Sequence, residues 1–323
     1  MIRLSVISEG AAPREAPVSE LPALLAAGLP TVWLDLESPT AEEAAVLLRD
    51  FRFHPVAVED ALVDTLHPKI DDYGDYLYVV LHGVMQDALT DDAKVDLQEI
   101  DFFLGSNFLV THRDVASPSI ASVRTRLEKQ PGFTRGPDGL FAAIVEVMTD
   151  RYLPIIDAFD EKIDAMEDEV FEGAAGQEIL GRVFAFKRST LKLRRTIHPQ
   201  REVIRNLSAG QYKIVGKDAQ ILLRDVYDHL FTIAELVETY RDLLSGTLEA
   251  HLSVTSNRLN VVMKRLTVIT TMLMVIGTMA GIWGMNFDAI PFAHDPHGFS
   301  WMLASMTVAG LVTAGILRLL RWS

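Results

Sequence analysis

A stretch near the C-terminal end of the sequence carries polar and small residues at helical spacing. Its members recur three or four positions apart, which places them on one face of a helix. They are Asn260, Met263, Leu266, Thr270, Met274, Gly277 and Gly281. Such a face can line a pore, whose polar groups contact ions and their water. It can equally form a tight seam between helices, because Gly277 and Gly281 make a small-xxx-small pair. The spacing alone leaves both interpretations open.

Most of this face lies in the first of two uncharged runs long enough to cross a membrane. Leu266–Phe287 has 22 residues and Gly298–Leu317 has 20. A hydrocarbon core about 30 Å thick needs about 20 such residues in a helix. We therefore expect membrane helices at about 265–284 and about 299–318, joined by an outer loop over 285–298. Together they make up a membrane domain over 264–323.

Basic residues lie before the first run and after the second, but not between the two runs. Lys264 and Arg265 precede the first run, and Arg318 and Arg321 follow the second, whereas residues 286–300 contain no lysine or arginine. The positive-inside rule then places both termini in the cytoplasm and the loop outside the cell. One pair of helices cannot enclose a pore, so a pore requires a symmetric ring of copies.

The composition argues against several classes of function. There is no cysteine, so no disulfide or thiolate metal site can form. The net charge of −14 argues against a nucleic-acid partner and favours cations as ligands. Without a Gly-rich phosphate loop or an H-E-x-x-H motif, we find no catalytic set and expect no enzyme. Ile2–Ile7 alternates like a strand and lacks a long apolar signal-peptide core, so roughly the first 260 residues are expected to stay in the cytoplasm.

Residues 1–135 are expected to form a cytoplasmic α/β domain. Strands follow from short apolar runs and helices from capping residues and helical periodicity. The expected strands are Ile2–Ile7, Thr31–Leu36, Tyr76–Leu81, Ile100–Leu104 and Phe108–Thr111, and the expected helices are Glu20–Ala27, Thr40–Phe51 and Pro55–Leu62.

Residues 136–263 are expected to form long helices that include a stalk. An acidic helix with apolar positions from Ile156 to Val170 precedes a basic helix over Leu180–Ile197. The two can neutralise each other, or the acidic face can bind cations. A heptad seam from Leu223 to Leu244 then continues without proline, which predicts one helix from about Lys217 to Trp283, roughly 100 Å long. Such a rod would couple the cytoplasmic part to the stripe of the first span.

The first span closes on Trp283-Gly284-Met285-Asn286-Phe287. With a second span close behind it, this motif resembles the CorA family of Mg²⁺/Co²⁺ transport proteins. The similarity extends over nearly the whole chain, including Trp33–Leu36, Tyr73–Tyr76 and Arg224–His229. It implies an α/β/α sandwich in the cytoplasm, very long helices, two C-terminal transmembrane helices and a funnel-shaped homopentamer in the cell membrane. It also implies a channel for Mg²⁺, with Co²⁺ as a further ion, driven by the electrochemical gradient and gated by cytoplasmic Mg²⁺.

The resemblance assigns roles to single residues. Gly284, Met285 and Asn286 would form the outer mouth, where a ring of Asn286 amides meets the entering ion. Met274, Leu266 and Met263 would be hydrophobic constrictions within the stripe, and Asn260 a lower polar ring. Asp225 would match a regulatory Mg²⁺ site between subunits.

Some positions differ from the family pattern, and two alternative functions are therefore retained. Val275 stands where the family often has proline, and Gly277 stands where a pore-facing threonine is expected, with Thr278 beside it. The outer loop carries His294 and His297, which suit transition metals and support a Zn²⁺, Co²⁺ or Ni²⁺ transporter as an alternative. A membrane-tethered scaffold or sensor is the other alternative, and it would need neither Asn286 nor the stripe.

Overall fold

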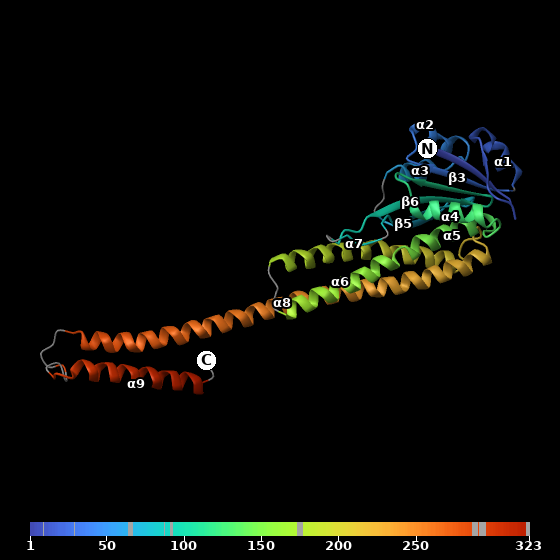
Figure 1. Cartoon of the computed structure of the whole chain (residues 1–323). Coiled ribbons are helices and arrows are strands. Elements are labelled where there is room, and N and C mark those ends of the chain that lie inside the picture. Colours follow the sequence, from blue (N-terminus) through green and yellow to red (C-terminus); the bar gives the residue numbers. More distant parts are fainter. Residues whose placement is uncertain are drawn as a thin grey trace. The chain divides into compact units, whose positions relative to one another are not determined.

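The computed structural model describes residues 1–8, 10–28, 30–63, 67–86, 88–90, 93–172, 177–285, 290 and 295–320 (Figure 1). The chain divides into two compact units, Met1–Leu248 and Glu249–Ser323. Helix α8 (Lys217–Trp283) is continuous and belongs to both units. Its bounds coincide with those predicted from the uninterrupted heptad seam.

A mixed sheet forms the centre of the first unit. In the described part of the chain its strands have the order β2-β1-β3-β7-β6-β5-β4. They are β1 (Ile2–Ile7), β2 (Arg14–Ala16), β3 (Thr31–Glu37), β4 (Lys69–Asp72), β5 (Tyr76–Val84), β6 (Leu97–Gly105) and β7 (Phe108–Arg113). β3 and β7 run parallel and every other neighbouring pair is antiparallel. All nine residues of β5 are buried, which is typical of a strand covered on both faces.

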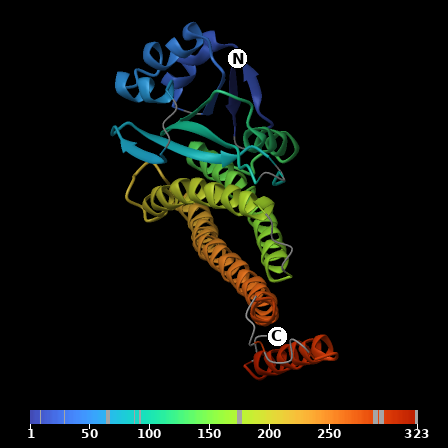
Figure 2. The ribbon, with the colours of Figure 1, turned by 90° about the vertical axis from the view of Figure 1, so that its left-hand side faces the viewer.

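Helices cover both faces of this sheet (Figures 1 and 2). The short helices α1 (Leu21–Ala27), α2 (Ala41–Arg49) and α3 (Pro55–Ala61), with the 3₁₀ turn Val18–Glu20, lie on one face. On the other face lie α4 (Pro118–Lys129) and α5 (Gly136–Asp150). The start of α2 is fixed by a capping box, in which the Thr40 side chain and the Glu43 side chain each bind the other's backbone N–H. The predicted α/β/α sandwich is therefore confirmed.

Three long helices complete the first unit: α6 (Leu153–Phe171), α7 (Gln177–Ser208) and the first part of α8. The predicted heptad positions of α8 are all buried, namely Leu223, Val226, Leu230, Ile233, Val237, Tyr240 and Leu244. Phe159 of α6 links the three helices, because its ring lies 5.1 Å from the ring of Phe186 and 6.1 Å from that of Tyr240.

Helix α7 is longer than the basic helix predicted over Leu180–Ile197. It continues through Pro199 to Ser208. The Oε1 atom of Gln200 accepts a hydrogen bond from the backbone N–H of His82 on β5 at 2.8 Å. Ile204 and Leu207 beyond it are buried. These contacts of the last turns outweigh the hydrogen bond that proline removes from a helix.

The predicted neutralisation of the acidic helix by the basic helix is limited to one place among the described residues. Arg182 of α7 pairs with Glu169 of α6 at 2.8 Å. Arg194 and His198 instead pair with Glu238 of α8. Within the described ranges, no group of three or more acidic or histidine side chains is placed to hold a metal ion. Cation binding by the acidic face of α6 stays a prediction.

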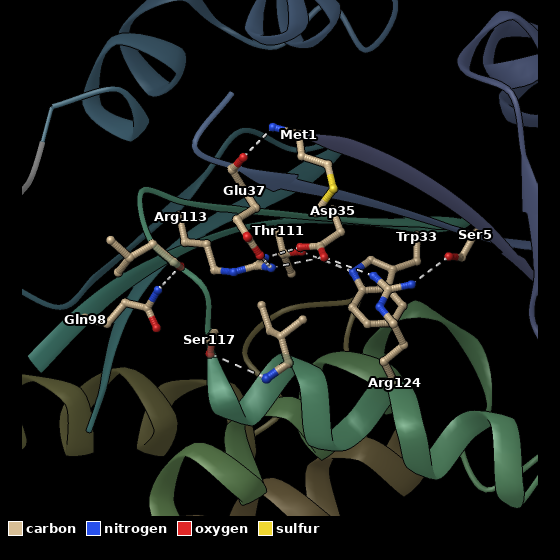
Figure 3. Close-up of polar contacts among 12 residues, drawn as sticks. Met1, Ser5, Trp33, Asp35, Glu37, Gln98, Thr111, Arg113, Ser117 and Arg124 are labelled. Carbon is tan, nitrogen blue, oxygen red and sulfur yellow. Dashed lines mark hydrogen bonds and ion pairs between the residues drawn. The ribbon is translucent and has the colours of Figure 1, made fainter. Parts of the chain in front are cut away.

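A buried ion network joins β3, β7 and α4 (Figure 3). Asp35 of β3 accepts hydrogen bonds from Arg113 of β7, from Arg124 of α4 at 3.0 Å, and from the Thr111 hydroxyl at 2.7 Å. Asp35 and Arg113 are each only 4% exposed. Burying these charges is tolerable only because they satisfy one another. The network therefore fixes where α4 sits on the sheet.

A second buried polar cluster centres on Asp101 of β6. Its carboxylate accepts a hydrogen bond from the Tyr78 hydroxyl at 2.7 Å and lies 3.0 Å from Nδ1 of His112. Burial raises the pKa of Asp101 from the ordinary value of 3.8 to about 6, and the hydrogen bonds from His112 and Tyr78 oppose that rise only in part.

This cluster predicts a pH dependence of folding. Between about pH 4 and pH 6, Asp101 is deprotonated in the unfolded state but still protonated in the folded state. The stability that protonated Asp101 contributes is therefore fully present below about pH 4 and is lost as the pH rises through about 6. Relative to Asp101→Asn, the natural protein should lose about 2–3 kcal/mol of stability over this interval. Thermal unfolding of both proteins at pH 4 and pH 6.5 measures the difference. Equal slopes with pH in the two proteins would contradict the raised pKa.

Candidate ion pathway

The predicted stripe lies on an open face of α8. Met263, Leu266 and Met274 are 59%, 56% and 66% exposed. Asn260, Thr270, Gly277 and Gly281 are exposed as well. The side of this helix that carries Thr271, Val275, Met279 and Trp283, four residues apart, is less exposed than the stripe positions. Within one chain the stripe is therefore not a seam with α9 (Gly298–Leu319).

Both predicted spans are helical, apolar and almost uncovered. The most apolar windows of α8 and α9 have mean hydropathies of 1.8 and 1.7, and 0% and 11% of their residues are buried. A core helix of a soluble protein of this length and apolarity would be buried by its own chain. Apolar surface that the chain itself leaves open calls for lipid or for other copies of the protein.

The polar end of the stripe borders a surface hollow of about 470 Å³. Asn260 and Met263, which their spacing places on one helical face, line it together. Asn257 and Thr267 line it too. Asn257 was not predicted as part of the site, although it continues the spacing of three residues toward the N-terminus. An amide is therefore present one turn before the first predicted polar ring.

The end of α8 defines the start of the predicted mouth. The backbone N–H of Gly284 donates to the carbonyl of Ala280 at 2.9 Å, and that of Met285 donates to Ile282 at 3.3 Å. The Met285 side chain is 49% exposed. Asn286, Asp288 and His294 lie outside the described residues, as does Arg321 in the C-terminal flank. The roles given to them remain predictions.

At the start of α9, His297 has a structural partner. Its backbone N–H donates to the side chain of Asp295 at 2.7 Å, in the turn that leads into the helix. This contact uses the backbone and leaves the imidazole ring unassigned. It adds nothing to the transition-metal interpretation of the loop.

The family described as CorA-like Mg²⁺ transporter protein matches residues 30–319 of this chain. The chain belongs to this CorA-like family. It is 31% identical over 291 residues to the protein YfjQ of Bacillus subtilis, covering 90% of this chain and 87% of that protein. It is 32% identical over 274 residues to the cobalt/magnesium transport protein CorA of Thermotoga maritima, covering 84% and 77%. The family is one of membrane transporters for divalent metal ions, not of enzymes.

The fold agrees with solved structures of the family. The complete structure of the CorA magnesium transporter from Methanocaldococcus jannaschii superimposes with a TM-score of 0.83 at 20% identity, over 98% of this chain and 97% of that one. At that identity the similarity supports the fold alone. A more distant relative is the zinc transport protein ZntB of Yersinia enterocolitica, 25% identical over 90% of this chain and 87% of that protein. The metal that this CorA-like chain carries is therefore open to proposal.

Asp225, predicted as a regulatory residue, lies on the outer side of α8 in the first unit. It is exposed, whereas its neighbours Leu223 and Val226 are buried in the heptad seam. Among the described residues its carboxylate has no hydrogen bond or ion pair. It is thus free to meet a cation or a partner from outside the chain.

Proposed function

We propose that this CorA-like protein is one subunit of a homopentameric channel through which Mg²⁺, and Co²⁺ as a further ion, enter the cytoplasm. The observation that supports this most is the stripe of α8. It combines amide, hydroxyl, thioether and glycine positions on the open face of an apolar helix. Polar groups facing lipid are costly, so such a face favours an aqueous axis shared by several copies.

The residue types along the proposed axis suit a hydrated ion. Mg²⁺ gives up its water reluctantly, and amide carbonyls such as those of an Asn286 ring can bind that water without removing it. Met274, Leu266 and Met263 provide apolar constrictions that close by losing water. A membrane potential of 100 mV contributes roughly 4.6 kcal/mol per divalent ion, so no ATP is needed.

Zn²⁺ is the second candidate cargo. It is supported by the relative named as a zinc transport protein, which matches most of this chain. We place it second because the relative named for cobalt and magnesium is more similar to this chain, at 32% identity against 25%.

The test is ion flux into liposomes that contain only the purified protein. Mg²⁺ entry should follow an imposed inside-negative potential, should be absent from protein-free liposomes, and should be inhibited by external Co²⁺. Zn²⁺ entry without Mg²⁺ entry would select the second candidate. An absence of flux for every divalent ion would favour the scaffold or sensor and overturn the channel.

Asp225 tests the proposed regulation. Asp225→Ala should raise the internal Mg²⁺ concentration needed for half inhibition at least about fivefold, because an intersubunit ion would lose a carboxylate ligand. The matched control is Glu128→Ala, which removes the same charge from an exposed position of α4. Flux at several internal Mg²⁺ concentrations measures the shift. Inhibition that is unchanged, or changed equally by both substitutions, would remove Asp225 from this role.

A further inference from the structure

A cavity of about 670 Å³ lies in the first unit, between the sheet and α7. Its walls come from His67 just before β4, from β5, from the start of β6, from the segment after β7 and from one face of α7. The proposed ion pathway uses none of these residues. The volume is in the range of small-molecule sites, which is roughly 300–1,000 Å³.

Positive charge is concentrated on the α7 wall. Arg188, Lys192 and Arg195 line the cavity, and their spacing of four and three residues places them on one helical face. Among the described residues neither guanidinium has an ion pair or hydrogen bond. Lys192 donates to the carbonyl of Val95 at 2.8 Å and keeps two further N–H donors. Three neighbouring cations without a carboxylate partner, in a chain of net charge −14, favour an anionic ligand.

The spacing of these cations indicates an extended anion. Arg188 and Arg195 are seven residues apart, which is about 10 Å along a helix axis. A single phosphate is too small to contact all three cations, whereas a chain of two or three phosphates can. Arginine is suited to this chemistry, since its planar fork binds two phosphate oxygens at once.

The remaining lining mixes polar side chains with three apolar ones. Leu97, Val115 and Leu191 line the cavity, and the Gln98 amide nitrogen donates to the carbonyl of Val115, which ties the segment after β7 to β6. His82 lines it as well and is only 7% exposed, yet its Nδ1 atom has no hydrogen-bond partner in the described structure. A buried polar atom without a partner is a position where a ligand or water is expected.

Two carboxylates in the lining limit the affinity for anions. Glu99 lies 3.4 Å from Nε2 of His82. Asp114 is exposed and, within the described ranges, has no partner. The lining thus carries three formal positive charges against two negative ones. Removing the negative charge of Asp114 should therefore strengthen the binding of an anion, whereas removing positive charge from the lining should weaken it.

We propose that this cavity binds a small molecule that combines a diphosphate or triphosphate chain with a less polar ring, the chemistry of a nucleoside diphosphate. The phosphates contact Arg188, Lys192 and Arg195, and the ring lies against the apolar side chains of Leu97, Val115 and Leu191. This binding is independent of ion transport, so it stands whatever metal the channel carries.

Calorimetric titration of the full-length protein in detergent, with a chelator to remove divalent ions, tests the site. Adenosine diphosphate is the probe, and inorganic pyrophosphate and adenosine are the comparison ligands. We expect saturable binding of one adenosine diphosphate per chain, tighter than pyrophosphate, and at least about a hundredfold weaker binding of adenosine. Absence of saturable binding, or equal binding of adenosine, would overturn the proposal.

Matched variants locate the binding. The double variant Arg188→Ala/Arg195→Ala should weaken it at least tenfold, whereas Lys187→Ala, which removes a charge beside the cavity but not in its lining, should change it less than twofold. Asp114→Asn should tighten it severalfold, a gain that misfolding cannot produce. Equal losses in Lys187→Ala and the double variant would indicate bulk charge attraction and overturn the site. Unchanged binding in the double variant would overturn it as well.

Discussion

Replacing Asn286 by alanine is expected to lower Mg²⁺ flux through the reconstituted protein at least about a hundredfold. Each amide that bonds a water of the entering ion contributes about 1 kcal/mol. Because the loss recurs in every subunit of the proposed ring, it sums to a few kcal/mol, and each 1.4 kcal/mol is a factor of ten. The measurement is Mg²⁺ entry into liposomes with equal amounts of protein.

Assembly must be intact for this result to bear on the mouth. The variant should elute at the same size as the natural protein, because Asn286 is assigned to the ion and not to packing. Gln211→Ala, which removes an exposed amide between α7 and α8, serves as the control and should leave flux unchanged. Normal Mg²⁺ uptake by a fully assembled Asn286→Ala protein would refute the mouth assignment.

The features that local patterns determine were predictable from the sequence. Helix α8 was placed at Lys217–Trp283, because its heptad seam and the following apolar run continue without a proline or a break in period. The stripe from Asn260 to Gly281 was placed on one face for the same reason. Both depend only on the rise and turn of a helix.

The elements that were missed in the sequence are defined by contacts between segments distant in the chain. β2 and β4 were not predicted, and β4 includes the neighbouring acidic residues Asp71 and Asp72. In the structure Lys69 of β4 pairs with Asp71 at 3.1 Å and with Asp60, so charge on this strand is compatible with its place at the edge of the sheet. A short, charged edge strand has no hydrophobic period to identify it.

The ion pathway and the cavity beside α7 also differ in how far the sequence could predict them. The pathway residues lie on one helix, so spacing alone could group them. The cavity beside α7 is built from several separate segments. In the sequence, Arg188 and Arg195 were interpreted only as part of a basic helix that can neutralise an acidic one. No local signal distinguishes a cation that faces a carboxylate from one that faces a cavity.

The buried network around Asp35 supplies the second large effect. Asp35→Ala would leave Arg113, which is 4% exposed, and the Arg124 guanidinium without their shared carboxylate. Removing one partner of a buried ion pair costs about 3–5 kcal/mol, because the remaining charge is then buried and uncompensated. The cost should appear as weaker attachment of α4 and easier opening of the parallel pair β3 and β7.

Amide hydrogen exchange on the intact protein in detergent measures this opening. At 1.4 kcal/mol for each factor of ten, the amides of β3 and β7 should exchange at least about a hundredfold faster in Asp35→Ala. The control is Glu20→Ala, which breaks the exposed pair with Arg14 at 3.0 Å and should change exchange by no more than about fivefold. Glu37 also contacts Arg113, at 2.6 Å. If Asp35→Ala accelerates exchange no more than the control does, Glu37 alone compensates that arginine and Asp35 is not what fixes α4 on the sheet.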